Sequence, residues 1–320
     1  FFKDNVNDQK PEVYKDEEIY AGNLCNEICL PSNHDESFVC CLASMNLLHY
    51  DEWKGTNAVK ILTYFLDAVM EEFIEESSGM ELMERSTEFA RNHRALGLGV
   101  LGWHSYLQNN NIAFESFDAT MKNAEIFRHL KQQTNEASKE LFDLFGGPDK
   151  YPDLGRRNTT LMAIAPTKSS SYILGQVSPS IEPYKSNYYI KDLAKAKEVF
   201  RNPYLKVLLE SKGQDNNDTW DSILNKDGSV QHLDFLSDHE KNVFKTFSEL
   251  SQMAVIKQAA QRQAFIDQGQ SLNVMIHPST PVKDINALYL EASDSGIKGL
   301  YYQINLSAAQ EFNRNFLDCE

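Results

Sequence analysis

A thiol, a carboxylate and an amide lie close together in the segment NLCNEIC, residues 23–29. Side chains alternate between two faces in an extended chain, so Asn23, Cys25 and Glu27 are expected on one face. A thiol can act as a nucleophile or a hydrogen-atom donor, a carboxylate as a general base, and an amide can hold a hydroxyl group. The three residues are therefore candidates for a catalytic group.

The same cysteines allow two other interpretations. A lone Cys is most often a small buried hydrophobe, and Leu24 and Ile28 would anchor the other face of such a packed segment. The spacing of Cys25 and Cys29 would suit a pair of metal ligands, but the chain has no second cysteine pair of this kind and its eight histidines are scattered singly. A metal site is therefore not expected. From these residues alone, packing and catalysis both stay open for Cys25.

The pattern Asn-Leu-Cys-x-Glu-Ile resembles the finger loop of ribonucleotide reductase large subunits, here residues 23–31. The resemblance implies that Cys25 carries a transient thiyl radical and takes the 3′-hydrogen of a ribose. It implies further that Glu27 is the base for the 3′-hydroxyl, and that Asn23 holds the ribose hydroxyls. The fold implied is α/β, the second half of a ten-stranded α/β barrel with a central finger loop.

A second segment of the same family follows. ESFVCCLAS, residues 36–44, is similar to the strand that bears one of two reducing cysteines. That register makes Cys40 the reductant and leaves Cys41 as a packed core thiol. The other reducing cysteine is expected on an earlier strand, in an N-terminal portion that precedes this chain. Cys319 could be the first cysteine of the family's redox tail, or simply an exposed thiol.

The apolar run 159–165 is followed by a loop rich in hydroxyl groups. Backbone N–H groups and hydroxyls after a strand can cradle a phosphate, although most such stretches are ordinary turns. Similar loops bind the substrate diphosphate in this family, and nearby IEP, residues 181–183, resembles a neighbouring loop, either rigid or in contact with substrate. The expected phosphate-binding residues are Pro166, Thr167, Lys168, Ser169 and Ser170.

Two adjacent tyrosines, Tyr301 and Tyr302, stand in an aromatic run that favours a β-strand. On a regular strand they would point to opposite faces. In class I reductases, a Tyr-Tyr pair at this place relays the radical, so the resemblance implies an order from Tyr302 through Tyr301 to Cys25. It also implies ribonucleoside diphosphate substrates. Asn305 follows where an Arg often stands, which affects details near the subunit interface.

The stretch GLGVLG, residues 97–102, matches the G-x-G-x-x-G pattern of dinucleotide-binding proteins. That interpretation requires a strand before the glycines, whereas residues 84–94 are polar and favour a helix. The stretch instead resembles a structural segment of the reductases. We expect its small residues to permit close helix packing.

Apolar periodicity outlines the remaining elements. Helices are expected at residues 57–75, 119–145, 191–212, 238–268, 283–295 and 306–317. Residues 36–48 are expected to form a buried strand that leads into a helix, and further strands are expected at residues 159–165 and 299–303. Residues 1–22 are expected to be irregular, and residues 213–230 to form a polar surface excursion.

The composition narrows the class of protein. With 31 basic and 46 acidic residues, the net charge is −15, which disfavours non-specific nucleic-acid binding. No apolar run approaches the roughly 20 residues of a membrane span. Five unevenly placed cysteines argue against a secreted disulfide framework and favour the cytoplasm, or the host cytoplasm if the protein is viral.

The leading hypothesis is therefore a class I ribonucleoside-diphosphate reductase large subunit, with residues 1–320 as the C-terminal part of its barrel and 306–320 as a final helix and the start of the redox tail. Such a chain binds no cofactor directly. It depends on a small subunit's metal and tyrosyl-radical cofactor, on an N-terminal large-subunit portion and on thioredoxin or glutaredoxin, in a dimeric α assembly. It could be a natural split subunit or a piece of a longer protein. The competing hypotheses are a non-catalytic assembly fragment and a nicotinamide oxidoreductase built on residues 97–102.

Overall fold

The computed structural model describes residues 1–193 and 196–305, with the backbone alone for residues 190–193 and 196–198. The expected helix at 306–317 and Cys319 lie outside these residues. The α-helices are α1 Lys3–Asp8, α2 Tyr50–Trp53, α3 Ala58–Ser77, α4 Glu84–His93, α5 Trp103–Asn109, α6 Phe117–Phe145, α7 Lys168–Ile173, α8 Pro203–Ser211, α9 Asn217–Asn225, α10 Asp238–Val243, α11 Gln252–Gln263 and α12 Val282–Asp294. The strands are β1 Leu42–Asn46, β2 Gly97–Leu101, β3 Tyr188–Leu193, β4 Ala196–Arg201, β5 Val274–Ile276 and β6 Gln303–Asn305.

Five extended segments lie side by side in the order of the sequence, all parallel. β1 pairs with β2, and β5 pairs with β6. Single parallel bridges join Leu98 to Met162 and Ile164 to Gln270, which link the two pairs through residues 162–164. Helices connect each segment to the next, as parallel pairing requires. The described residues are thus a mixed α/β unit with five parallel segments, and they show no closed barrel.

β2 lies in the middle of the core, and all five of its residues are buried. Its glycines are there because neighbouring strands leave no room for a side chain. A Cβ at Gly99 would lie 2.5 Å from the carbonyl oxygen of Ala163, and one at Gly97 would lie 2.9 Å from the Ala163 Cβ. The expectation of close helix packing was therefore wrong: the small residues permit close packing of strands. Because these glycines sit inside a buried strand, they do not form the phosphate-binding turn of a dinucleotide site.

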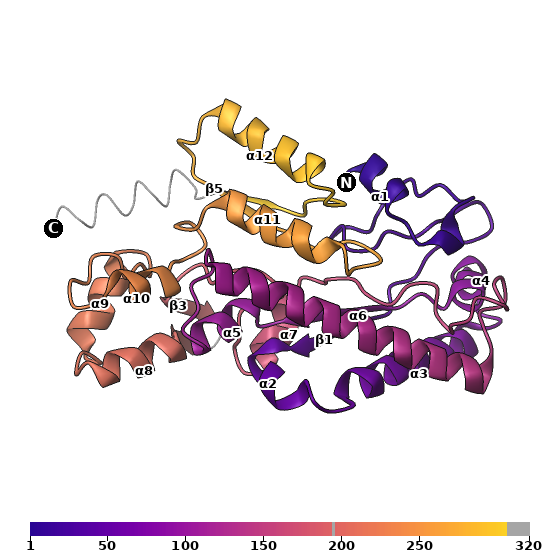
Figure 1. The fold of residues 1–320 in the computed structure, drawn as a ribbon, viewed down its shortest axis with the longest axis horizontal. Helices are drawn as coiled ribbons and strands as arrows, with labels where there is room; N and C mark the ends of the chain where they lie inside the picture. Colours follow the sequence, from indigo (N-terminus) through magenta and orange to yellow (C-terminus); the bar gives the residue numbers. More distant parts are fainter. Residues whose placement is uncertain (194–195, 306–320) are drawn as a thin grey trace.

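Long helices cover one side of this core. Figure 1 shows α6 running between α3 and α11, and both of these helices contact it. The helices expected at 57–75, 119–145 and 283–295 are confirmed as α3, α6 and α12. The N-terminus lies beside the end of α12, where the Asn5 amide donates hydrogen bonds to the carbonyl oxygens of Ser293 and Ile297. No helix in the described residues is long and apolar enough to cross a membrane.

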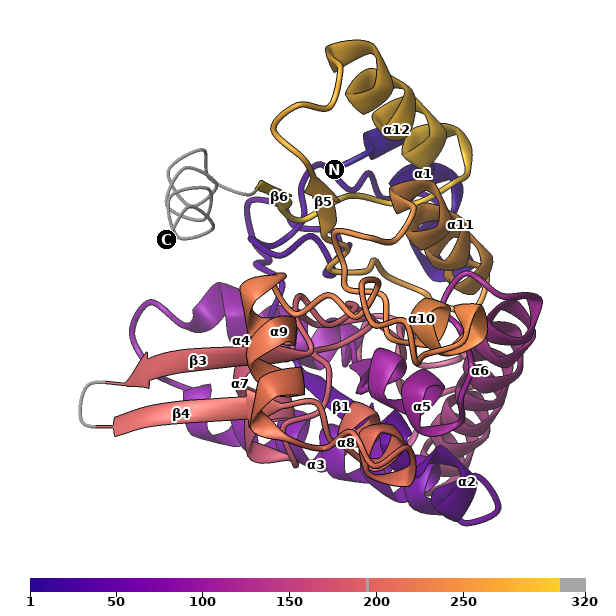
Figure 2. The same ribbon diagram turned by 90° about the vertical axis from the view of Figure 1, so that its left-hand side faces the viewer.

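The helix expected at 191–212 is wrong in its first half. β3 and β4 form an antiparallel hairpin there, which projects from the body of the molecule in Figure 2. Cross-strand stacking of Tyr189 on Phe200, with ring centroids 4.8 Å apart, favours the hairpin. A helix then begins at Pro203, because the Asn202 side chain accepts the backbone N–H groups of Tyr204 and Leu205 and because proline suits the first helical position.

The polar stretch 213–230 is not a surface excursion either. It contains α9, which Asn216 caps and which buries Thr219, Trp220 and Ile223 on one face. With α8 and α10 it surrounds a second small apolar cluster. The abundance of Asn and Asp hid a helix whose buried face is only three residues wide.

Three further expectations need correction. The predicted helix 238–268 is interrupted, because Glu249 accepts hydrogen bonds from the Thr246 N–H and hydroxyl and fixes a turn between α10 and α11. Residues 1–22 contain α1 and a 3-10 helix at Glu12–Tyr14, and they bury Val6, Tyr14 and Ile19 completely. The run 159–165 is extended but forms only the two isolated bridges, not a continuous strand.

Replacing Gly99 with Ala should destabilise the protein. The new Cβ would meet backbone atoms that cannot move without displacing the neighbouring strand, so we expect a loss of about 1–3 kcal/mol in the free energy of unfolding. Gly55→Ala is the matched control, because no atom lies within 4 Å of a Cβ at that position. Chemical denaturation of the two variants would measure the difference, and equal stability would contradict the packing described for β2.

Candidate active site

The finger loop is a turn rather than an extended strand. The Asn26 N–H donates to the Asn23 carbonyl oxygen at 3.1 Å, and Asn26 has a left-handed φ of 59°. The side-chain oxygen of Asn23 accepts the Ile28 N–H at 3.1 Å and closes the turn. The expected alternation of faces is therefore wrong at Leu24, which is 84% exposed, although Ile28 is buried as predicted. The side-chain N–H groups of Asn23 can donate to a hydroxyl of a ligand.

Glu27 is the buried carboxylate of this loop, with an exposed fraction of 2%. The Ser271 hydroxyl donates to its Oε2 at 3.0 Å. A carboxylate is costly to bury without such a donor, so Ser271 helps to keep it in place. Sequence reasoning missed Ser271, because a single serine so far along the chain from Glu27 gives no local signal.

Two neighbouring segments fasten the finger loop. The Gly269 N–H donates to the Glu27 carbonyl oxygen at 2.7 Å, and the Asn26 amide donates to the Leu300 carbonyl oxygen at 2.7 Å. A Cβ at Gly269 would lie 2.5 Å from the Asn26 carbonyl oxygen, so only glycine permits this approach. The loop is thus held between the segments that lead to β5 and β6.

The two tyrosines do not point to opposite faces. Their ring centroids lie 4.0 Å apart with an interplanar angle of 34°, just before β6 begins. The regular alternation fails because the Tyr302 N–H donates to the side chain of Asn273, at 3.0 Å, instead of to a backbone carbonyl. Hydrogen bonds with Cys25 and then with Tyr302 raise the pKa of Tyr301. Cys25, Tyr301 and Tyr302 therefore form one contiguous group.

The vicinal cysteines occupy different environments. Cys40 is exposed, whereas Cys41 is buried and its thiol donates to the Leu66 carbonyl oxygen on α3. Desolvation, followed by the nearby Glu27 and Cys25, raises the pKa of Cys40 to about 11. Burial raises the pKa of Cys41 to about 12. Cys40 is thus the member of the pair that lies within electrostatic reach of Cys25 and Glu27.

The expected phosphate loop leads into α7. Thr167 precedes the helix with a left-handed φ of 47°, and its hydroxyl accepts the N–H of Ser180, which also has a left-handed φ, of 53°. Strained conformations of this kind persist only where the surrounding structure holds them, and they are common in ligand-binding loops. The first N–H groups of a helix lack intrahelical acceptors, so those following Thr167 can receive an anion. Ser169 and Ser170 are exposed.

The side chain of Lys168 in this loop points toward Glu182. Lys168 Nζ donates to both carboxylate oxygens of Glu182, at 2.8 and 2.9 Å. Glu182 also accepts the side-chain amide of Asn273. The loop of residues 181–183 is therefore connected by side chains to the segment that carries Tyr302.

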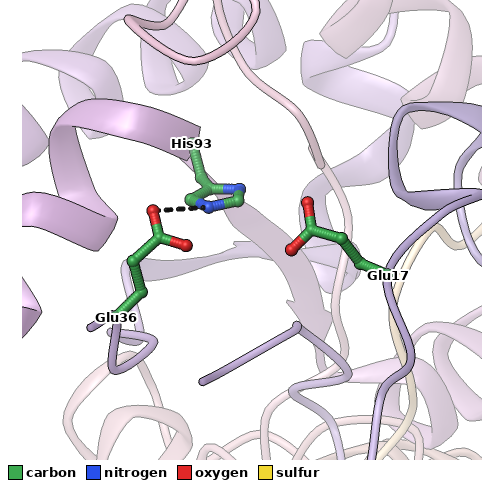
Figure 3. A group of neighbouring side chains, drawn as sticks. All are labelled: Glu17, Glu36 and His93. Atoms are coloured by element: carbon green, nitrogen blue, oxygen red, sulfur yellow. Dashed lines mark hydrogen bonds and ion pairs between the residues drawn. The ribbon is translucent and has the colours of Figure 1, made fainter. Parts of the chain in front are cut away.

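A second cluster of titratable groups lies at the end of α4. Ligand atoms of Glu17, Glu36 and His93 all lie within 4.8 Å of one another (Figure 3), close enough for a metal ion. The Lys150 ammonium bridges the two carboxylates, at 3.1 and 3.3 Å, so the place of a cation between them is taken by a side chain. Burial lowers the pKa of His93, which accordingly stays neutral near pH 7. We interpret the cluster as an anchor for the residues that lead into Cys40.

The alkylation of Cys40 should depend on pH in a defined way. A raised pKa keeps the thiol protonated, so its thiolate fraction grows only as the pH rises toward 11. At pH 8.5, iodoacetamide should modify Cys40 on the order of a hundredfold more slowly than a free cysteine. Fragmentation mass spectrometry of a Cys41→Ala variant would distinguish alkylation of Cys40 from alkylation of the remaining cysteines, with the urea-unfolded chain as the control. An inflection near pH 8.5 in the folded protein would contradict the desolvation described here.

The chain is similar to known proteins over most of its length. The chain matches the ribonucleotide reductase barrel domain over residues 1–153 and 148–303. It is 40% identical to the ribonucleoside-diphosphate reductase large subunit of Invertebrate iridescent virus 6, over 87% of this chain and 29% of that protein. A putative ribonucleoside-diphosphate reductase large subunit of Frog virus 3 is also 40% identical, over 89% of this chain and 50% of the relative.

A solved structure is similar throughout. The Actinobacillus ureae class Id ribonucleotide reductase α subunit superposes with a TM-score of 0.92 and 59% identity, covering 100% of this chain and 59% of that one. The chain spans no more than half the length of the two viral relatives. It belongs to the class I ribonucleotide reductase family, as a portion of the large-subunit barrel domain.

Proposed function

We propose that the complete subunit containing this chain reduces ribonucleoside diphosphates to deoxyribonucleoside diphosphates by radical chemistry. One observation carries the proposal: the Cys25 thiol is hydrogen-bonded to Tyr301, which packs on Tyr302, while Cys40 lies within electrostatic reach of Cys25 and Glu27. The proposal assigns to these neighbouring groups the radical route, the hydrogen-atom donor, the base and the reductant.

In the proposed reaction, an electron leaves Cys25 through Tyr301 and then Tyr302, and the thiol proton leaves with it. The Cys25 sulfur takes the 3′-hydrogen atom of the ribose, Glu27 takes the proton of the 3′-hydroxyl, and the 2′-hydroxyl departs as water. Cys40 and a second thiol of the complete subunit supply two electrons and two protons and become a disulfide. Cys25 then returns the hydrogen atom to C3′, and Glu27 returns its proton to the 3′-oxygen. One ribonucleotide and one dithiol thus yield one deoxyribonucleotide, one disulfide and one water.

The tyrosines suit a relay in which protons and electrons move together. The hydrogen bond with Cys25 raises the pKa of Tyr301, so the phenol is protonated throughout the physiological range. Losing an electron without the proton would leave a positively charged phenol radical, so joint transfer of the proton and the electron avoids separating charge.

The loop after residue 165 is proposed to bind the diphosphate. The hydroxyls of Thr167, Ser169 and Ser170 and the N–H groups at the start of α7 supply donors, and Pro166 fixes the approach of the chain. Lys168 supplies a positive charge nearby. Asn23 is proposed to position the ribose hydroxyls with its amide N–H groups.

The remaining partners follow from membership of the family. A small subunit generates the oxidant with its own metal and radical cofactor, and an N-terminal portion of the large subunit completes the barrel. Thioredoxin or glutaredoxin regenerates the dithiol, with Cys319 proposed for the redox tail. The solved relative is an α subunit of class Id, which favours a class I small subunit as the partner. We place the assembly, an α dimer, in the reducing cytoplasm.

Turnover should depend on the thiol of Cys25 and not on the thiol of Cys41. We expect Cys25→Ser in the complete subunit to abolish reduction of CDP to dCDP, because a hydroxyl does not give up its hydrogen atom at an accessible potential. Cys41→Ala is the matched control and should keep most of the activity, since its thiol faces α3. Product analysis with the small subunit and dithiothreitol would measure both. If Cys25→Ser kept its activity, the proposal would fail; if the parent assembled without turnover, the non-catalytic assembly fragment would be favoured.

The relay can be tested separately at Tyr301. Tyr301→Phe keeps the ring that packs on Tyr302 but removes the hydroxyl that is hydrogen-bonded to Cys25. We expect CDP affinity close to that of the parent, measured by equilibrium dialysis, and a loss of turnover of at least roughly a thousandfold, in the range seen when an obligatory group is removed. A variant that still turns over at the parent rate would show that the radical reaches Cys25 by another route.

A further inference from the structure

A continuous row of polar contacts joins the phosphate loop to the tyrosine pair. It runs from Lys168 through Glu182 and Asn273 to the backbone N–H of Tyr302. We propose that Glu182 and Asn273 are positioning residues, which adjust the placement of Tyr302 according to whether a diphosphate occupies the loop at α7. This inference rests on the proposed function, because it requires the loop to bind substrate and the tyrosines to relay the radical.

The first contact is built so that an anion can compete for it. Lys168 is the first residue of α7, and its side chain is 48% exposed, whereas that of Glu182 is 8% exposed. The lysine can therefore turn toward a bound phosphate, while the carboxylate cannot follow it. A diphosphate carries more negative charge than one carboxylate and would draw the ammonium away from Glu182.

The second contact transmits this change because Asn273 has a fixed orientation. Its amide nitrogen donates to Glu182 and its oxygen accepts the Tyr302 N–H. Reversing the amide would place oxygen against carboxylate and nitrogen against N–H, so both contacts oppose rotation. Asn273 is 5% exposed, so water does not readily replace either partner. When Glu182 loses its lysine, Asn273 is its remaining side-chain donor among the contacts described here, and the carboxylate holds that amide more firmly.

The third contact acts on the peptide that sets the ring of Tyr302. Its carbonyl oxygen accepts the Val274 N–H at 3.0 Å, as part of the pairing of β5 with β6. Its N–H, in contrast, depends on the side chain of Asn273. A displacement of that side chain therefore tilts the Tyr302 peptide about a fixed carbonyl, and the ring moves relative to Tyr301, 4.0 Å away. Electron transfer between two rings is sensitive to their distance and orientation. The movement of the Tyr302 ring would therefore make the relay more efficient when a diphosphate is bound than when the loop is empty.

A fluorine label at Tyr302 would report this movement directly. The complete subunit carrying 3-fluorotyrosine at position 302 is titrated with CDP, and the ¹⁹F resonance should shift on binding. The shift should disappear in Lys168→Met, Glu182→Gln and Asn273→Leu, measured at CDP concentrations that equilibrium dialysis shows to be saturating. Lys168→Met removes only a half-exposed side chain and leaves the core intact. Lys122→Met, which breaks an ion pair on α6, is the matched control and should keep the shift.

Kinetics separate positioning from a structural role. In the holoenzyme, Asn273→Leu should lower kcat for CDP reduction roughly ten- to hundredfold, as a misplaced group does, with KM changed by less than about twofold. A residue needed only for folding would instead lower the thermal midpoint and the active fraction. The Glu182→Gln variant, which preserves volume, should show the same split between kcat and KM.

The possible outcomes distinguish this inference from the proposed function. If the parent binds CDP without a fluorine shift, or if the shift persists in Asn273→Leu or Glu182→Gln, the coupling is overturned and the proposed function stands. If the parent does not bind CDP, the phosphate loop assignment is overturned and the coupling with it. Loss of the shift in all three variants at saturating CDP, with the control unchanged, supports the coupling.

Discussion

The approach of the Gly269 backbone to the finger loop is the contact on which the site depends. The Gly269 N–H holds the Glu27 carbonyl oxygen at 2.7 Å, at a distance that leaves no space for a Cβ. The same segment contains Ser271, which donates to the carboxylate of Glu27, and Asn273, which accepts the N–H of Tyr302. One short segment therefore fixes both the carboxylate of Glu27 and the peptide of Tyr302. Moving this segment would separate the thiol from the tyrosines that it contacts.

Buried polar groups hold that segment against the rest of the molecule. The Gln268 side chain accepts the Cys29 N–H and donates to the Leu96 carbonyl oxygen, which joins the finger loop to the entry of β2. Lys298, only 1% exposed, donates to the carbonyl oxygens of Asp267 and Gln9, and burial lowers its pKa. Such groups are expensive to bury and are tolerated where every hydrogen bond is made. Their cost is consistent with a segment that holds the finger loop in one position.

The sequence predicted the residues of the site better than their geometry. The types and spacing of Cys25, Glu27 and the Tyr301–Tyr302 pair, read with a family resemblance, were enough to expect them in one place. The turn at Asn26 and the stacking of the tyrosines could not be predicted, because both depend on hydrogen bonds from residues far along the chain. Asn273 gave no local signal, since its role exists only through partners on two other segments.

In the fold, too, the sequence predicted some elements and missed others. The long amphipathic helices α3, α6 and α12 were predicted because one strong periodicity specifies each of them. The hairpin of β3 and β4 and the short helix α9 were missed, because cross-strand stacking and a buried tryptophan override weak local preferences. Gly97 and Gly99 were misread as helix-packing residues because sequence alone does not show which backbone passes beside a glycine.

The fate of the 3′-hydrogen of the substrate tests most directly whether Cys25 initiates the chemistry. CDP labelled with tritium at C3′ would be incubated with the complete subunit, the small subunit and a dithiol. If the Cys25 sulfur takes the 3′-hydrogen and returns it, unlabelled CDP should react faster than labelled CDP, and a small part of the tritium should appear in water during turnover. Equal reaction rates with no release of tritium, in an enzyme that forms dCDP, would contradict hydrogen abstraction by the finger loop.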